Sequence, residues 1–114
     1  MAIPETDLAR IRPLLDQYCE ARVPLHVRDK VTMGFSVQGS AITIFERRPG
    51  YIKPHEWHEE AIARFRYNAT SGLWALYCMY LDLKWHRYDS HRPAKRFETL
   101  LAEVDADPTH IFWG

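Results

Sequence analysis

The chain has few of the residues that mark specialised classes of protein. Only two of its 114 residues are cysteine and five are glycine, so a disulfide-stapled scaffold and a glycine-rich phosphate loop are both excluded. Fifteen basic and fifteen acidic residues cancel, so no global field attracts nucleic acid or an anionic membrane. No apolar run is long enough to cross a membrane as a helix. This length predicts one domain, residues 1–114, with a single core.

The first residues and the cysteines indicate a compartment. The opening MAIPETDLAR carries acids and no apolar segment of the kind found in signal peptides, so we expect a cytoplasmic, reducing environment. Cys19 and Cys78 both fall on apolar faces of predicted elements, which favours buried free thiols. A bridge between them stays open, because the sequence does not fix their separation. No nucleophile elbow is present, and we expect no cofactor.

Two helices are predicted, one before and one after the strands. Apolar residues recur at intervals of three and four over residues 8–19, and Pro24 limits this helix. Pro13 either kinks it or lies in the first turn of a restarted helix. The second helix is expected to begin at residues 90–93, and its apolar stripe covers residues 97–104.

The middle of the chain alternates like strands. Residues 61–67 place Arg64 and Arg66 on one face and mostly apolar residues on the other, with Ile62 as the exception. Residues 73–81 carry no charge and are apolar on both faces, which predicts a central strand covered on both sides. Residues 48–60, with two prolines and one glycine, are expected to form a loop. The predicted strands are residues 30–37, 41–47, 61–67, 73–81 and 85–89.

These patterns predict an α+β fold. An N-terminal helix precedes an antiparallel sheet of about five strands, built from a hairpin and a three-strand meander. A C-terminal helix follows. The closing peptide THIFWG is too apolar to remain in water, so we expect this aromatic tail to dock on the sheet or on another subunit.

An arginine–carboxylate cluster is the first candidate site. Glu46, Arg47 and Arg48 end one strand, and Arg64 and Arg66 share a face of a neighbouring one. Several guanidinium groups on one sheet face could hold phosphate or carboxylate bidentately. The net charge of zero instead favours internal pairing of these arginines with nearby acids.

Aromatic side chains accompany these arginines. Tyr51, Trp57 and Trp85 could stack on bases, as in sheet-based proteins that bind single strands. Arg87 is expected near Arg64 and Arg66. Nucleic-acid binding is therefore possible, but the charge balance does not favour it.

Acidic residues also gather where the second helix ends. Asp105 and Asp107, with Glu103, oppose the helix dipole there. We hypothesise that they pair with the strand arginines and lock the tail. The alternative is that they bind a cation or a basic partner.

A metal site is the weakest candidate. His55 and His58 are three residues apart among three carboxylates and would share a face of one helical turn. The zinc-protease signature needs histidines four apart, and two ligands are too few for a structural site. A solvated polar loop is the favoured interpretation.

Three blocks of sequence together resemble a known family. They are FERRP at residues 45–49, ARFRY at 63–67 followed by LWALY at 73–77, and LAEVDADPTHIFWG at 101–114. They are similar to a small bacterial family called domain of unknown function DUF3024, and the likeness covers nearly the whole chain. The family pattern usually has glycine where this chain has His110, so the sequence alone does not demand a left-handed backbone there. The resemblance supports the domain boundaries and implies no activity.

Two functional hypotheses remain. The first is a non-enzymatic binding or protein-interaction domain, which could form a homodimer through its aromatic surface or tail. The second is a small enzyme, or a nucleic-acid- or anion-binding domain, that uses the arginine–carboxylate cluster. A cleft where Glu46, Arg48, Arg64 and Asp107 converge would favour the second, and a flat apolar patch around Trp113 would favour assembly.

Overall fold

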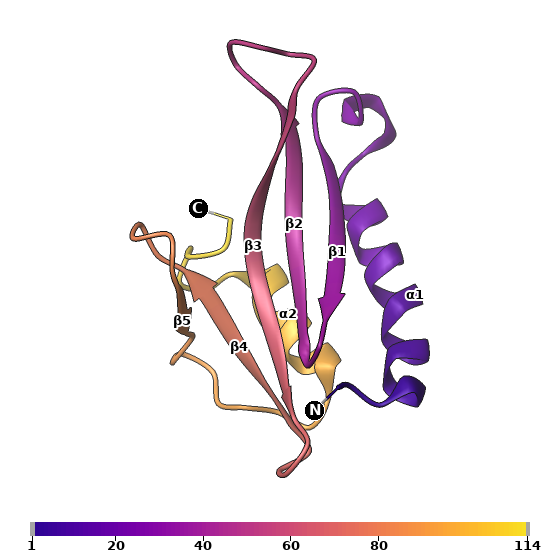
Figure 1. Cartoon of the computed structure of the whole chain (residues 1–114), viewed down its shortest axis with the longest axis vertical. Helices are drawn as coiled ribbons and strands as arrows, with labels where there is room; N and C mark the ends of the chain where they lie inside the picture. The colour runs from indigo at the N-terminus through magenta and orange to yellow at the C-terminus, as the bar shows by residue number, and fades with distance from the viewer. Residues whose placement is uncertain (1, 114) are drawn as a thin grey trace.

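The computed structural model of the chain describes residues 2–113, with two helices and an open antiparallel sheet of five strands (Figure 1). The α+β prediction is therefore confirmed. The helical elements are α1 (Glu5–Arg22), the short 3₁₀ turn η1 (Leu25–Val27) and α2 (Phe97–Ala106). The strands are β1 (Thr32–Gln38), β2 (Ala41–Pro49), β3 (Trp57–Asn68), β4 (Leu73–Met79) and β5 (Trp85–Arg87).

Each strand pairs with its neighbour in sequence, in the order β1-β2-β3-β4-β5, so the predicted hairpin and meander form one continuous sheet. The predicted loop over residues 48–60 is too long. β2 continues to Pro49 and β3 begins at Trp57, because ladder pairs such as Arg47 with Glu59 extend the β2–β3 ribbon. This ribbon projects beyond the neighbouring strands (Figure 1).

One core fills the space between the helices and one face of the sheet. Phe97 of α2 packs its ring 4.6 Å from that of Phe65 on β3 and 5.2 Å from that of Trp74 on β4. Ile11 and Leu15 of α1 are fully buried in the same cluster. Strand residues alternate between the two faces of a sheet. The neighbours of Phe65 in β3 and of Trp74 in β4 therefore lie on the opposite face.

That opposite face is only partly covered. Along β4, Trp74, Leu76 and Cys78 are buried, whereas the residues between them are only half-buried. The prediction that this strand is covered on both sides is wrong, because both helices pack on the same face of the sheet (Figure 1). The half-buried residues are Leu73, Ala75, Tyr77 and Met79.

A β-bulge interrupts the β2–β3 ladder. Ile44 pairs with Ala63 and Phe45 pairs with Ala61, so Ile62 is the extra residue. A bulge turns two consecutive side chains to the same side, and Ile62 and Ala63 are both buried. This explains why Ile62 breaks the alternation of the sequence.

Two predicted details of the helices are settled by the backbone. α1 runs without interruption through Pro13. α2 begins at Phe97, so its predicted start at residues 90–93 is wrong. The reason is a backbone pairing outside the helix, in which Ala94 exchanges hydrogen bonds of 2.8 and 2.9 Å with Trp74 and stays extended.

The tail folds back on the body of the protein. Phe112 is buried with its ring 5.0 Å from that of Tyr88, and Trp113 donates its indole N–H to the Val104 carbonyl at 3.0 Å. Asp107 and His110 have φ angles of 45° and 61°, so the tail does use a left-handed backbone at His110.

Two further expectations concern the cysteines and the membrane. Cys19 and Cys78 are both buried and free. Within residues 2–113, no helix combines the length and the apolar character needed to cross a bilayer.

Candidate functional site

A row of side chains crosses four strands on the face of the sheet that the helices leave uncovered. Thr43 of β2 pairs with Arg64 of β3, and Arg64 pairs with Tyr77 of β4. Tyr77 in turn pairs with Arg87 of β5. Directly paired residues project to the same side of a sheet. We call this surface the open face and define it by Arg64, Arg66, Tyr77, Trp85 and Arg87.

The arginines of the open face lie over aromatic rings. The Arg64 guanidinium is 4.5 Å from the centre of the Trp85 ring, and its Nε donates a hydrogen bond of 3.0 Å to the Thr43 hydroxyl. The guanidinium groups of Arg66 and Arg87 lie 5.7 and 5.9 Å from the centre of the Tyr77 ring. Cation–π contacts and the hydroxyl hold these side chains in place and do not neutralise their charge.

The charges on this face are not balanced by acids. Among residues 2–113, Arg64, Arg66 and Arg87 form no ion pair with a carboxylate. Partial burial, and then the nearby charge of Arg66, lower the pKa of Arg64. Arginine nevertheless stays protonated in proteins, so three positive charges lie together without a counterion from the described chain. Such a cluster favours a bound anion.

A depression adjoins one end of the open face. It measures about 410 Å³ and is bounded by Arg66, Tyr77 and Arg87 on one side and by the β3–β4 turn on the other. In that turn the Asn68 side chain accepts backbone hydrogen bonds from Thr70 and Ser71, so the turn is held in a fixed conformation. The depression thus offers both guanidinium groups and a rigid polar wall.

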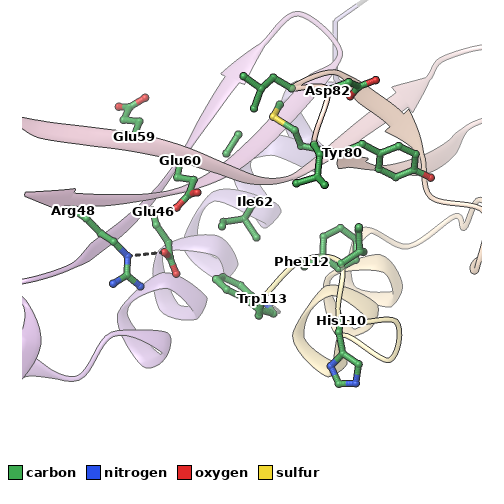
Figure 2. Close-up of a pocket in the computed structure, with 15 residues that line it drawn as sticks. Glu46, Arg48, Glu59, Glu60, Ile62, Tyr80, Asp82, His110, Phe112 and Trp113 are labelled. Carbon is green, nitrogen blue, oxygen red and sulfur yellow. Dashed lines mark hydrogen bonds and ion pairs between the residues drawn. The ribbon is translucent and has the colours of Figure 1, made fainter. Parts of the chain in front are cut away.

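The other candidate surface is a larger hollow of about 1070 Å³ between the β2–β3 ribbon, the β4–β5 turn and the tail (Figure 2). Glu46 and Arg48 form an ion pair of 3.1 Å in it, and Phe112 and Trp113 form its opposite wall. We call this hollow the groove. It lies on the helix-bearing side of the sheet, because Glu46 continues the alternation of the core residues of β2.

The structure separates the residues of the predicted arginine–carboxylate cluster. Arg47 pairs with Glu59 across the ribbon at 2.7 Å, and Arg48 pairs with Glu46, as expected for internal pairing. Arg64 and Arg66 do not follow that expectation. In the described part of the chain, there is no cleft in which Glu46, Arg48, Arg64 and Asp107 converge. Of these four residues, only Glu46 and Arg48 line the groove.

The acidic residues at the end of α2 hold the fold together. Asp107 is buried and accepts backbone hydrogen bonds from Phe112 at 3.1 Å and Trp113 at 2.9 Å. Asp105 pairs with Arg22 of α1 at 3.0 Å. We hypothesised from the sequence that these acids pair with the strand arginines. Asp107 instead accepts hydrogen bonds from backbone amides of the tail.

The remaining candidates lie on the ribbon. Trp57 starts β3 and is partly exposed, far along the strand from Arg64, and Tyr51 is fully exposed in the β2–β3 loop. His55 lies in that loop and His58 in β3, so the two do not share a helical turn. Over residues 2–113 there is no group of three or more His, Cys, Asp or Glu residues that could hold a metal ion.

Sequence reasoning did not identify Tyr77 as a functional residue. Tyr77 lies in a run of uncharged residues. Strand register places it beside Arg64 and Arg87, and the alternation of residue types in the sequence does not determine that register. The one sequence feature that could have indicated Tyr77 is its residue type, because tyrosine combines an apolar ring with a polar hydroxyl that usually finds a hydrogen-bond partner.

Comparisons with known proteins address the family and not the activity. Neither curated proteins nor solved structures gave a match to this chain. A family model described as "Domain of unknown function (DUF3024)" matches residues 3–114. The chain therefore belongs to the DUF3024 family.

Proposed function

We propose that this chain is a non-enzymatic binding domain that holds single-stranded nucleic acid on its open face. The observation that carries the proposal is the group of three arginines that lack a carboxylate partner in the described chain and lie over aromatic rings. Guanidinium groups bind phosphate oxygens bidentately, and a base can stack on a guanidinium plane that itself lies over an aromatic ring.

The placement of the aromatic rings in the open face favours a single strand over a duplex. Tyr77 and Trp85 are half-buried and lie beneath the arginines, so this layer of rings and guanidinium planes can be reached only by a base that is splayed out against the surface. Bases of a duplex are stacked inside it and cannot reach such rings. Stacking is tolerant of sequence, so little sequence preference is expected.

The neutral net charge is compatible with this proposal because binding depends on the local field. Arg64, Arg66 and Arg87 place positive charge on one face, whereas Asp105 and Asp107 lie by the tail. A cytoplasmic location is part of the proposal, since a reducing compartment would keep the two thiols free.

The test is a fluorescence-anisotropy titration of a labelled oligothymidylate at several salt concentrations. We expect binding that weakens as salt rises, with a slope of about −0.7 per phosphate contact in a plot of log affinity against log salt. The variants Arg64→Gln, Arg66→Gln and Arg87→Gln should each reduce that slope by about 0.7. Trp85→Leu should weaken binding by about 1–3 kcal/mol without changing the slope.

Arg12→Gln is the matched control. Arg12 is exposed on α1, in the helical layer, so its removal changes net charge equally and leaves the open face intact. Thermal melts of every variant are needed to check that each is folded. The proposal fails if the wild-type chain shows no salt-sensitive binding, or if Arg12→Gln has the same effect as the open-face variants.

A further inference from the structure

The free edge of β3 opens into the groove. β3 pairs with β4 only over residues 63–68, and residues 57–61 pair with β2 alone. Figure 1 shows β4 diverging from β3 along this half of the strand. Glu59, Glu60 and Ala61 of the unpaired half line the groove. An unpaired strand edge presents a row of backbone N–H and C=O groups that another chain can pair with.

We propose that this edge accepts an extended basic segment of a partner protein as an additional strand. Backbone hydrogen bonds to residues 57–61 would supply much of the affinity, and alternate side chains of the segment would enter the groove. This site is independent of the open face, because the groove lies on the other side of the sheet.

Apolar side chains along the groove indicate what the inward-facing residues of the segment should be. Leu81 is fully exposed and Leu83 is largely exposed at the tip of the β4–β5 turn, and Ile111 is partly exposed on the tail. Leu83 also has a φ of 61°, a conformation that costs a leucine about 1–2 kcal/mol relative to glycine. An exposed leucine in a strained turn is unfavourable for an isolated domain. Aliphatic side chains of a partner would cover it.

The charges around the groove indicate the polar residues of the segment. Glu60 forms no ion pair among residues 2–113, and Glu46 is already paired with Arg48. Glu59 pairs with Arg47, and Asp82 accepts hydrogen bonds from the Lys84 backbone and from His86 that lower its pKa. Four acids and one arginine line the groove, so its lining carries an excess of negative charge, which complements lysine or arginine in the partner.

The same charges disfavour a second copy of this chain as the occupant. Pairing of two β3 edges would place Glu60, which has no ion pair among residues 2–113, close to Glu60 of the other copy. Like charges at paired strand positions are destabilising. A basic partner avoids this repulsion.

The test uses fluorescein-labelled peptides of alternating arginine and valine, long enough to span residues 57–61. Two further peptides are N-methylated at every second residue, in opposite phases. For a given strand direction, the side chains that enter the groove fix which amides face β3, so only one phase blocks those amides. We expect that phase to weaken binding by about tenfold or more and the other phase to have little effect. Amide NMR shifts of residues 59–61 locate the contact.

Variants of the protein separate the apolar and ionic contributions. Leu81→Ser should weaken peptide binding by about tenfold and leave the fold intact, since Leu81 is fully exposed. Glu60→Gln should weaken it about two- to fivefold, and Glu20→Gln, an exposed acid on α1, should not change it. Arg64→Gln should leave peptide binding unchanged even where it weakens oligonucleotide binding.

Three outcomes would overturn the inference. Equal binding of the two N-methylated peptides would show attraction by charge alone. If Leu81→Ser binds the peptide with unchanged affinity, Leu81 makes no apolar contact with it. Light scattering that shows a dimer of the chain alone, with the amides of residues 59–61 protected, would make a second copy the occupant.

Discussion

Asp107 and Trp113 are joined by a hydrogen bond of 2.9 Å from the Trp113 backbone N–H to the Asp107 carboxylate. The other carboxylate oxygen accepts the N–H of Phe112 at 3.1 Å. One buried acid at the end of α2 thus satisfies two consecutive amides of the tail. Hydrogen bonds to an ionised acceptor are about twice as strong as neutral ones, so this residue fixes the tail against the core.

The first prediction concerns Asp107→Asn. Asparagine tolerates the left-handed backbone of this position but offers one accepting oxygen, so one tail amide loses its partner. We expect a loss of about 1–3 kcal/mol in the free energy of unfolding, measured by urea denaturation. Asp105→Asn is the control, because this exposed acid pairs only with side chains and should cost less than about 1 kcal/mol. Equal losses in the two variants would contradict the role of Asp107.

The second prediction concerns the backbone at His110. The residue is exposed and has a φ of 61°, which glycine adopts without steric cost. His110→Gly should therefore stabilise the chain by about 1 kcal/mol in a thermal melt. Gly39→Ala is the converse control. Nothing lies within 4 Å of its new Cβ, so its φ of 60° alone should destabilise by a similar amount. A loss of stability in His110→Gly would mean that the imidazole makes a favourable interaction.

The third prediction concerns the thiols. Burial, and to a lesser extent Asp16, raises the pKa of Cys19 to about 11, and burial raises that of Cys78. The reactive species is the thiolate, so neither cysteine should react with a disulfide reagent at pH 8 in the native protein. Both should react after denaturation. Rapid modification of one thiol in the native state would show that its helix or strand opens easily.

The fourth prediction concerns acid stability. A hydrogen bond and ion pair with Arg10 lower the pKa of Glu98 at the start of α2. A lowered pKa gives stability that is present above the unfolded value of about 4.3 and is lost as pH falls through the folded value. Glu98→Gln should therefore flatten the decline in stability below pH 5. The effect should be at most about 1 kcal/mol, because both side chains are partly exposed. An unchanged acid profile would show that other carboxylates control the decline.

Much of the fold could be predicted from local patterns. Alternation located the strands, and the apolar stripe located α2, because each pattern follows from the geometry of its own element. The start of α2 could not be predicted, since the pairing of Ala94 with Trp74 is a contact between distant segments. The extent of the ribbon was missed for the same reason, as residues 57–60 look polar and become strand only through pairing with β2.

The candidate site was predicted in part. The shared face of Arg64 and Arg66 followed from their spacing on one strand. The lack of a carboxylate partner for these arginines could not be predicted, because Glu59 and Glu46 were equally available in sequence. Strand register places Glu59 opposite Arg47, and Glu46 pairs with Arg48 two residues along the same strand. Composition gives the number of charges and contains no information on which ones are neighbours.

The extra residue at Ile62 has a consequence for the shape of the whole sheet. A bulge bends its strand and increases the local twist, and the pairing between β3 and β4 stops immediately beside it, at Ala63 with Cys78. A chain without Ile62 would have a straighter and less twisted β3. A single aliphatic residue thus marks the point at which β3 leaves its neighbour in the sheet and its edge becomes free.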